Sequence, residues 1–290
     1  MKPYFGNREQ AAVQPSFGPA VHAGRQVVYR TAGRGRGGIV RLVSPGDLGA
    51  HMKPFIFLDL FDIKGNGQEF PMHPHSGIAT VTVNIEGAMH YRESTGAEGV
   101  LPAGGVEWMS AGNGVWHTAS PAEGGHMRGF QLWLALPAED ENGPAHSQYL
   151  APEDVPCAGP ARVVLGTYAG VTSPIRPRAS ITYLQVTLVA GERWSYVPPP
   201  GHDVGWLAVA KGKLLTAGGT VGQEVVVFED GESAIDVVAQ TDVEFVLGSA
   251  PRHPHDLVNG HYSVHTTRAT LEQGEREIAR LGRELGIAAG

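Results

Sequence analysis

Glycine and proline interrupt this sequence so frequently that long helices are excluded over most of its length. The chain contains 40 glycines and 21 prolines in 290 residues, and both residue types interrupt helices and favour turns. The segments between them are short and apolar. Residues 80–86 alternate strictly, which places Val81, Val83 and Ile85 on one face of a strand. The sequence therefore predicts an all-β fold of many short strands joined by turns.

Two groups of strand-like segments share a weak pattern. Residues 84–87 (NIEG) and residues 209–212 (VAKG) each end in a glycine that precedes another strand-like segment. We interpret them as two copies of one β-barrel unit. We also predict that Gly87 forms a tight turn from which residues 88–92 pair back as a hairpin.

A proline-rich stretch separates the two groups of strands. Five prolines lie between residues 137 and 160 among acidic and small residues, which is typical of a connection between domains. We therefore predict an N-terminal domain of residues 1–145 and a C-terminal domain of residues 146–290.

The C-terminal segment carries the clearest helix signal in the sequence. Thr270 and Gln273 have the spacing of a capping box, with Thr270 as the N-cap. Four apolar residues then fall on one helical stripe: Leu271, Ile278, Leu281 and Leu285. We predict a C-terminal helix that serves packing and has no chemical role.

Charge and cysteine content restrict the class of protein. Lysine and arginine number 22 and aspartate and glutamate 29, which gives a net charge of −7 and argues against general nucleic-acid binding. The single cysteine, Cys157, cannot form an internal disulfide, which fits a reducing compartment. No signal-peptide pattern is visible, and no apolar run approaches the roughly 20 residues that span a bilayer. We therefore expect a cytoplasmic protein that is not bound to a membrane.

Three histidines have a spacing that suits a metal ion. His73 and His75 are two residues apart on an extended segment, so their side chains point to the same face. Pro74 restricts His73 to extended backbone angles and stiffens the pair. His117 follows later in the chain, where a neighbouring strand can bring it opposite the pair. Neutral imidazoles bind iron, copper, nickel or zinc, and the alternative is a surface pair with an unrelated third histidine.

The segments around these histidines have a more specific pattern than the spacing alone. HPHSGIATV at residues 73–81, VEWMSAGNGVWH at residues 106–117 and GFQLWL at residues 129–134 resemble the pirin family of the cupin superfamily. The resemblance covers about residues 30–286. It implies a bicupin, which consists of two antiparallel β-barrels of jelly-roll type, with a metal in the N-terminal barrel only.

The resemblance also implies a ligand set and an activity. In the family, iron or another divalent metal is held by both histidines of the HPH motif, a third histidine and a glutamate two residues beyond it. The corresponding residues here are His73, His75, His117 and Ala119. Some members cleave quercetin with dioxygen, and others are transcriptional cofactors.

Two glutamates of the family pattern are alanines in this chain. Ala119 replaces the ligand, and Ala79 replaces the acidic residue of the HPH-x-G-x-E run. Three neutral imidazoles leave the 2+ charge of a metal uncompensated among its ligands, so we expect weaker binding. Glu69 and Glu107 are nearby in sequence and would substitute only if their strands direct them inward.

The second copy of the repeat has no comparable ligands. Alignment of Gly87 with Gly212 places residues 198–200, which are all proline, at the HPH position. We therefore expect no metal in the C-terminal half.

The leading functional hypothesis is a metal-dependent dioxygenase of the quercetin 2,3-dioxygenase type that acts on a flavonol or similar phenol. It requires one divalent metal, iron ahead of copper, nickel, manganese or zinc, weakly held by His73, His75 and His117. The alternative is a non-enzymatic protein of the same fold that binds a regulatory protein partner. A hydrolase in which the metal activates water ranks third.

Overall fold

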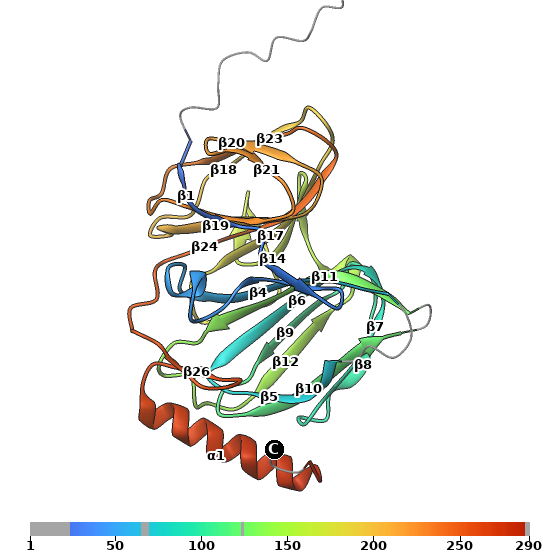
Figure 1. Cartoon of the computed structure of the whole chain (residues 1–290), viewed down its shortest axis with the longest axis vertical. Coiled ribbons are helices and arrows are strands. Elements are labelled where there is room, and N and C mark those ends of the chain that lie inside the picture. Colours follow the sequence, from blue (N-terminus) through green and yellow to red (C-terminus); the bar gives the residue numbers. More distant parts are fainter. Residues whose placement is uncertain (1–23, 65–69, 123–124, 288–290) are drawn as a thin grey trace, which may run out of the picture.

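The computed structural model describes residues 24–64, 70–122 and 125–287, and it consists of two similar β units with one helix at the end (Figure 1). Each unit pairs a seven-stranded sheet with a four-stranded sheet. All ladders between the named strands are antiparallel in the described residues. The prediction of an all-β bicupin of jelly-roll type with a C-terminal helix is confirmed, although the sheets do not close into barrels.

The first unit contains the strands of the N-terminal half. Its large sheet has, in spatial order, β12 (His146–Leu150), β9 (Val106–Ser110), β6 (Ile78–Gly87), β11 (His126–Ala135), β4 (Phe55–Lys64), β3 (Ile39–Val43) and β2 (Arg34–Arg36). Its small sheet has β5 (Phe70–His75), β10 (Val115–Pro121), β7 (Met89–Glu93) and β8 (Glu98–Leu101).

The second unit repeats this arrangement. Its large sheet has β1 (Val27–Thr31), β22 (Val225–Phe228), β19 (Val204–Lys211), β24 (Val243–Ala250), β17 (Thr182–Leu188), β14 (Ala161–Leu165) and β13 (Cys157–Ala158). Its small sheet has β18 (Arg193–Tyr196), β23 (Ile235–Ala239), β20 (Leu214–Thr216) and β21 (Gly219–Val221). Outside both lie β15 (Thr167–Tyr168), β16 (Val171–Thr172), β25 (Val258–Asn259), β26 (Val264–His265), the short 3-10 helices η1 (Leu48–Ala50) and η2 (Pro152–Asp154), and α1 (Arg268–Glu284).

Each unit contains one strand that comes from the other half of the sequence. β1, near the start of the described chain, pairs with β22 of the second unit. β12, which begins directly after residue 145, pairs with β9 of the first unit. The division into residues 1–145 and 146–290 stays a prediction, and these two pairings link the halves across it.

The hairpin predicted at Gly87 is wrong. β6 pairs with β11 and β9, whereas β7 pairs with β10 and β8 in the facing sheet. Gly87 has a φ of 73°, in the left-handed region that favours glycine, and a Cβ there would lie 2.8 Å from the carbonyl carbon of His126. The chain therefore turns at Gly87 from one sheet to the other. Gly212, with a φ of 86°, occupies the corresponding turn between β19 and β20.

The large sheets pack against each other and form a core that both units share. Phe130 and Leu132 of β11 belong to the same buried cluster as Trp206 and Ala208 of β19. Phe55 of the first unit contacts the Trp206 ring edge to face, with the ring centroids 5.3 Å apart. Because side chains alternate along a strand, β11 directs its other residues into the first unit.

The interiors of the two units differ in polarity. The second unit is filled by a separate cluster of buried apolar side chains from β17, β19, β22 and β24. The interior of the first unit instead contains histidine, glutamate, threonine and glutamine side chains beside apolar ones. The functional groups identified in the sequence thus lie in the first unit.

α1 begins earlier than predicted and packs beside the first unit, against β10 and β26 (Figure 1). Its N-cap is Thr267, whose hydroxyl accepts a hydrogen bond of 3.2 Å from the backbone N–H of Thr270. Thr270 is therefore the third residue of the helix and not its cap. Leu271 is buried as predicted, whereas Leu285 is exposed. No helix in the described ranges is long and apolar enough to cross a membrane.

Replacing Gly274 of α1 by alanine should lower the stability of the protein, although alanine is the better helix former by about 1 kcal/mol. A Cβ at this buried position would lie 2.8 Å from the Cβ of Ser76 and 2.9 Å from Nε2 of His265. We expect a net loss of about 1–3 kcal/mol from overpacking, measured by calorimetry. An unchanged or higher melting temperature would show that α1 does not dock through this face.

Candidate metal centre

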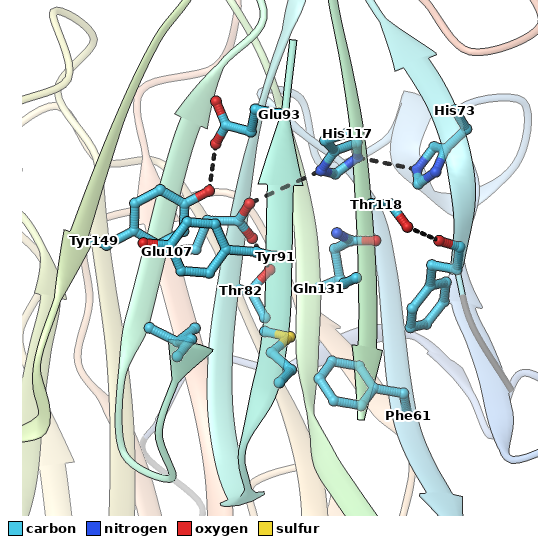
Figure 2. Close-up of a pocket in the computed structure, with 14 residues that line it drawn as sticks. Phe61, His73, Thr82, Tyr91, Glu93, Glu107, His117, Thr118, Gln131 and Tyr149 are labelled. Carbon is cyan, nitrogen blue, oxygen red and sulfur yellow. Dashed lines mark hydrogen bonds and ion pairs between the residues drawn. The ribbon is translucent and has the colours of Figure 1, made fainter. Parts of the chain in front are cut away.

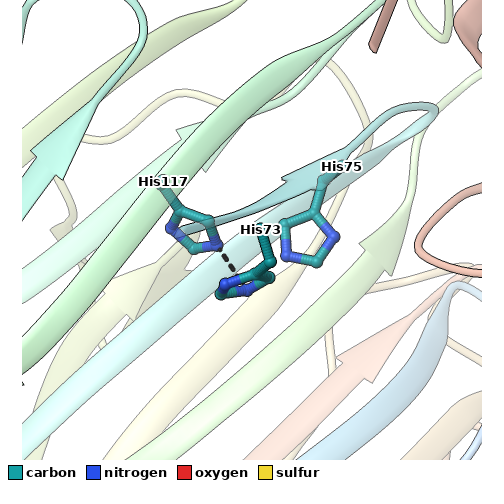
Figure 3. Close-up of side chains that lie close together, drawn as sticks. All are labelled: His73, His75 and His117. Atoms are coloured by element: carbon teal, nitrogen blue, oxygen red, sulfur yellow. Dashed lines mark hydrogen bonds between the residues drawn. The ribbon is translucent and has the colours of Figure 1, made fainter. Parts of the chain in front are cut away.

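The structure brings His73, His75 and His117 together inside the rim of the first unit (Figure 3). One nitrogen of each ring lies within 4.8 Å of the others. The ring centroids are 4.4 Å apart for His73 and His117, and 4.9 Å apart for the other two pairs. The three side chains are therefore close enough to bind one ion.

Two paired strands place these rings. His117 of β10 lies directly opposite His73 of β5 in the antiparallel ladder. His75 points to the same face as His73 because residues two apart on a strand share a face. β5 is the edge strand of its sheet, where Pro74 interrupts no inner ladder. Because β5 pairs with a neighbour on one side only, the proline of the HPH motif does not disrupt the sheet.

Backbone carbonyls determine which ring nitrogen of the first two histidines carries its proton. Nδ1 of His73 lies 2.7 Å from the carbonyl oxygen of Pro71, and Nδ1 of His75 lies 2.9 Å from that of Tyr262. A carbonyl oxygen only accepts, so each Nδ1 donates and each Nε2 presents a lone pair. The Nε2 atoms of His73 and His117 are 3.0 Å apart, and Nε2 of His75 is buried without a hydrogen-bond partner.

This donor set fits a divalent metal ion. Burial lowers the pKa of all three imidazoles, that of His75 to about 3, so the rings stay neutral at physiological pH. Neutral imidazole nitrogens that converge on one point are the ligands of catalytic metal sites. Of the three converging nitrogens, Nε2 of His75 has no partner in the protein, and those of His73 and His117 face each other. Three ligands from the protein leave further coordination positions free for substrate.

His202, another buried histidine, differs from His75 in its hydrogen bonds. His202 of the second unit is 1% exposed, and its Nδ1 and Nε2 lie 2.8 Å and 2.9 Å from the hydroxyls of Ser249 and Ser180. Both of its nitrogens are thus satisfied by the protein. Nε2 of His75, in contrast, has no hydrogen-bond partner in the protein.

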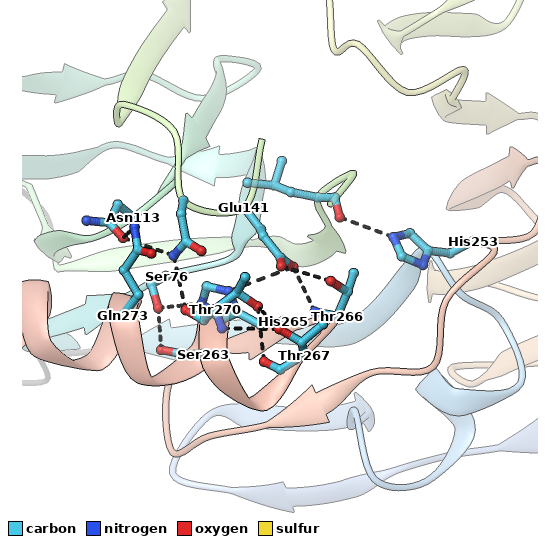
Figure 4. Close-up of polar contacts among 12 residues, drawn as sticks. Ser76, Asn113, Glu141, His253, Ser263, His265, Thr266, Thr267, Thr270 and Gln273 are labelled. Atoms are coloured by element: carbon cyan, nitrogen blue, oxygen red, sulfur yellow. Dashed lines mark hydrogen bonds and ion pairs between the residues drawn. The ribbon is translucent and has the colours of Figure 1, made fainter. Parts of the chain in front are cut away.

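The segment before α1 supplies the acceptor for His75, and a polar network beside it links this segment to Ser76 (Figure 4). The Ser76 hydroxyl lies 2.9 Å from the Ser263 hydroxyl and 2.9 Å from Nε2 of His265. These contacts hold the segment that carries Tyr262 against β5. Tyr262 lies before α1, so this contact does not test the prediction that the helix itself serves packing.

Two glutamates lie behind His117 in the interior of the unit (Figure 2). Glu107 is 6% exposed, accepts a hydrogen bond from Thr82, and has Oε1 3.9 Å from Nδ1 of His117. Burial raises its pKa to about 7. Glu93 lies opposite His117 in the β7–β10 ladder and accepts hydrogen bonds from hydroxyl groups, including that of Tyr149.

Sequence reasoning named Glu107 only as a conditional candidate and missed Glu93. The structure directs Glu107 inward, toward the far nitrogen of His117 rather than toward the convergence point of the rings. Only the register of β7 against β10 brings Glu93 near His117, and the sequence does not specify that register. Glu69 lies outside the described residues.

The two alanines have different surroundings. Ala119 lines an interior cavity of about 20 Å³ together with His73 and His117, so it faces the site and offers no donor atom. Ala79 is fully buried in the core between the two units. The absence of a carboxylate at residue 79 therefore does not change the surroundings of the three imidazoles.

A second cavity, of about 470 Å³, lies on the other side of His73, between β5 and α1. Trp116 forms part of its wall, and its Nε1 donates to the carbonyl of Ile278 in the helix at 2.9 Å. The remaining wall includes Tyr262, Glu275 and further residues of β5 and α1. We call this cavity the helix groove.

Comparisons with known proteins agree with this architecture. Residues 39–134 match the family described as Pirin. A Pseudomonas aeruginosa protein provisionally named quercetin 2,3-dioxygenase is 34% identical over 243 residues, which cover 77% of this chain and 84% of that protein. A pirin-like protein of Caulobacter vibrioides is 37% identical over 209 residues, which cover 67% of this chain and 74% of that protein.

Solved structures share the fold. A quercetin 2,3-dioxygenase from Acinetobacter baumannii aligns with a TM-score of 0.81 and 23% identity, over 90% of this chain and 98% of that one. The bacterial pirin YhhW from Escherichia coli, in complex with nickel(II), aligns with a TM-score of 0.64 and 20% identity, over 79% of this chain and 98% of that one. At these identities the likeness establishes the fold alone.

The metal-free protein should lose stability as the pH falls below about 6.5. The pKa of His75 is lowered to about 3 by burial, whereas in the unfolded chain it has its ordinary value of 6.5. The unfolded state therefore binds more protons between these values. The contribution of His75 to stability is fully present above pH 6.5 and is lost as the pH falls toward 3. Between pH 7.5 and 5 this amounts to about 2 kcal/mol.

Urea unfolding of chelator-treated protein across this pH range measures the loss. The His75→Gln variant should show a flatter dependence. An equal slope for both proteins would contradict the assignment of a buried, neutral imidazole.

Replacing Ala119 by glutamate should tighten metal binding and destabilise the metal-free protein. A carboxylate at this position faces the same cavity as His73 and His117. Phe70 and Tyr91 lie opposite Ala119 on the two adjacent strands, so the larger side chain overpacks the interior by about 1–3 kcal/mol. The Ala119→Gln variant has the same shape without the charge. It should destabilise equally without tighter metal retention in dialysis, and equal retention by both variants would refute the idea.

Proposed function

The chain belongs to the pirin family, and on that premise we propose that it is a metal-dependent oxygenase of the quercetin 2,3-dioxygenase type. The relative from Pseudomonas aeruginosa carries that activity in its provisional name. The substrate class we propose is a flavonol or a similar phenol.

The observation that carries this proposal is the convergence of three imidazole nitrogens from three rings, two of which are oriented by backbone carbonyls. His73, His75 and His117 would hold the metal. We propose iron, with nickel supported by the pirin of the same fold that contains nickel(II); copper, manganese and zinc suit the same ligands. When bound, such a metal supplies a positive charge for a phenolic oxygen and an open position for dioxygen.

The cavity volumes support an approach of the substrate from the side of α1. The interior cavity of about 20 Å³ has room for about one water molecule, which excludes an aromatic substrate. The helix groove, of about 470 Å³, falls in the range of about 300–1,000 Å³ that is usual for ligand sites. His73 lines both cavities. A substrate in the helix groove would therefore contact the candidate ligand His73 from the side of α1.

The residues of the helix groove suit a planar phenol. Trp116 and Tyr262 provide aromatic surface against which a substrate ring can pack. A phenol that binds as its anion must give its proton to a base. Glu275 and His261 are exposed side chains on the wall of the groove, and they are the candidates for this base.

A second candidate function is a non-enzymatic one, in which the chain uses the pirin fold to bind a regulatory protein partner. Ala119 favours it, because the acidic ligand that the family uses is absent. This candidate requires neither turnover nor a retained metal.

Elemental analysis of protein purified without an affinity tag, paired with aerobic turnover of quercetin and related polyphenols, separates the two. The oxygenase requires close to one metal per chain after reconstitution, together with dioxygen uptake that matches substrate loss. A metal-loaded protein without turnover would leave the binding function as the better explanation.

Filling the helix groove should lower kcat/KM for the substrate without removing the metal. Ala279 is an exposed residue of α1 on the wall of the groove, and Ala279→Trp places a large ring there. We expect kcat/KM for quercetin to fall at least about tenfold, or about 1.4 kcal/mol of transition-state stabilisation. Ala269 is also exposed on α1 but lies outside the groove, so Ala269→Trp is the matched control. Equal activity of the two variants at equal metal content would exclude this route.

A further inference from the structure

We propose that Glu107 is a positioning residue that supplies, from behind His117, the negative charge that the ligand set lacks. This inference rests on the proposed metal site but not on the proposed oxygenase activity. It concerns the side of the site that faces the interior, opposite the helix groove.

The strand register places Glu107 in this position. It lies on β9, opposite Thr82 of β6 and Tyr149 of β12, and points into the unit (Figure 2). Thr82 donates its hydroxyl hydrogen to one carboxylate oxygen, Oε2. The other oxygen, Oε1, lies 3.9 Å from Nδ1 of His117, the ring nitrogen that does not face His73.

The three histidines then share one arrangement. Nδ1 of His73 and of His75 each faces a carbonyl oxygen, and Nδ1 of His117 faces a carboxylate. Such outer partners determine the tautomer and the orientation of a metal-binding imidazole, and a carboxylate also raises its basicity. In the proposed arrangement Glu107 favours the orientation of His117 that presents Nε2 to the other two rings. At 3.9 Å the interaction is electrostatic and is not a hydrogen bond.

The lack of negative charge among the three candidate ligands also favours a role for Glu107. Three neutral imidazoles give a divalent ion no compensating charge, and Ala119 cannot provide one. A carboxylate that is 6% exposed interacts with a nearby cation through little water, so the attraction is weakly screened. Glu107 thus supplies part of the negative charge that a glutamate ligand would contribute, but it does so from behind His117 and without contacting the metal.

Glu93 provides a matched comparison, because it is a second buried carboxylate in the same interior. It is 5% exposed and accepts hydrogen bonds from the hydroxyls of Thr95, Ser147 and Tyr149. Three hydroxyl donors satisfy this carboxylate within the protein. Glu93 therefore serves the structure of the interior, whereas Glu107 faces a candidate ligand.

The test compares Glu107→Gln with Glu93→Gln in the full-length chain. Each substitution keeps the shape of the side chain and removes its charge. The affinity for Co²⁺ is measured at pH 7.5 by competition with a chelator, and the melting temperature is measured on the metal-free protein. We expect about 10–100-fold weaker Co²⁺ binding for Glu107→Gln, without a lower metal-free melting temperature. For Glu93→Gln we expect affinity within about threefold of the native protein and a lower melting temperature.

Other results would overturn the inference. Equal Co²⁺ affinity of Glu107→Gln and the native protein would refute the role of Glu107 while leaving the metal site intact. Failure of the native protein to bind Co²⁺ would refute the metal site and this inference together. If Glu107→Gln does not fold, Glu107→Asp keeps the charge at a longer distance. It should bind Co²⁺ more weakly than the native protein with an altered visible absorption spectrum, and an unaltered spectrum and affinity would count against the proposal.

Discussion

The hydrogen bond from Nδ1 of His75 to the carbonyl of Tyr262 joins two segments that are 187 residues apart in sequence. It determines which nitrogen of His75 presents a lone pair, and it leaves Nε2 buried without a partner in the protein. The same contact requires the segment before α1 to dock on β5, which the bonds of Ser76 to Ser263 and His265 stabilise. Docking of α1 then closes one wall of the helix groove.

The two units have the same strand order but use their interiors differently. The second unit fills its interior with apolar side chains, and the large sheets bury a further apolar core between them. This packing stabilises the assembly, since each buried large apolar side chain contributes about 1.5–3 kcal/mol. The first unit can therefore contain buried histidine and glutamate side chains, whose desolvation costs stability.

The alanine at residue 119 does not leave the site without acidic residues. Glu107 and Glu93 lie in the same interior, and the register of β9 and β7 brings both near His117. The two carboxylates differ in their surroundings, because hydroxyl groups satisfy Glu93 while Glu107 faces an imidazole. Position on a neighbouring strand, rather than proximity in sequence, decides which acidic residue is near the histidines.

Local sequence patterns predicted the alternating strands and the shared face of His73 and His75, and the pirin resemblance identified His117 and Ala119. Contacts between distant segments specify the remaining features. The glycine at residue 87 permits a hairpin or a crossing between sheets, and only the partners of β6 and β7 select the crossing. The acceptor for His75 and the carboxylate behind His117 come from distant segments, because strand register and docking depend on burial of side chains far apart in the chain.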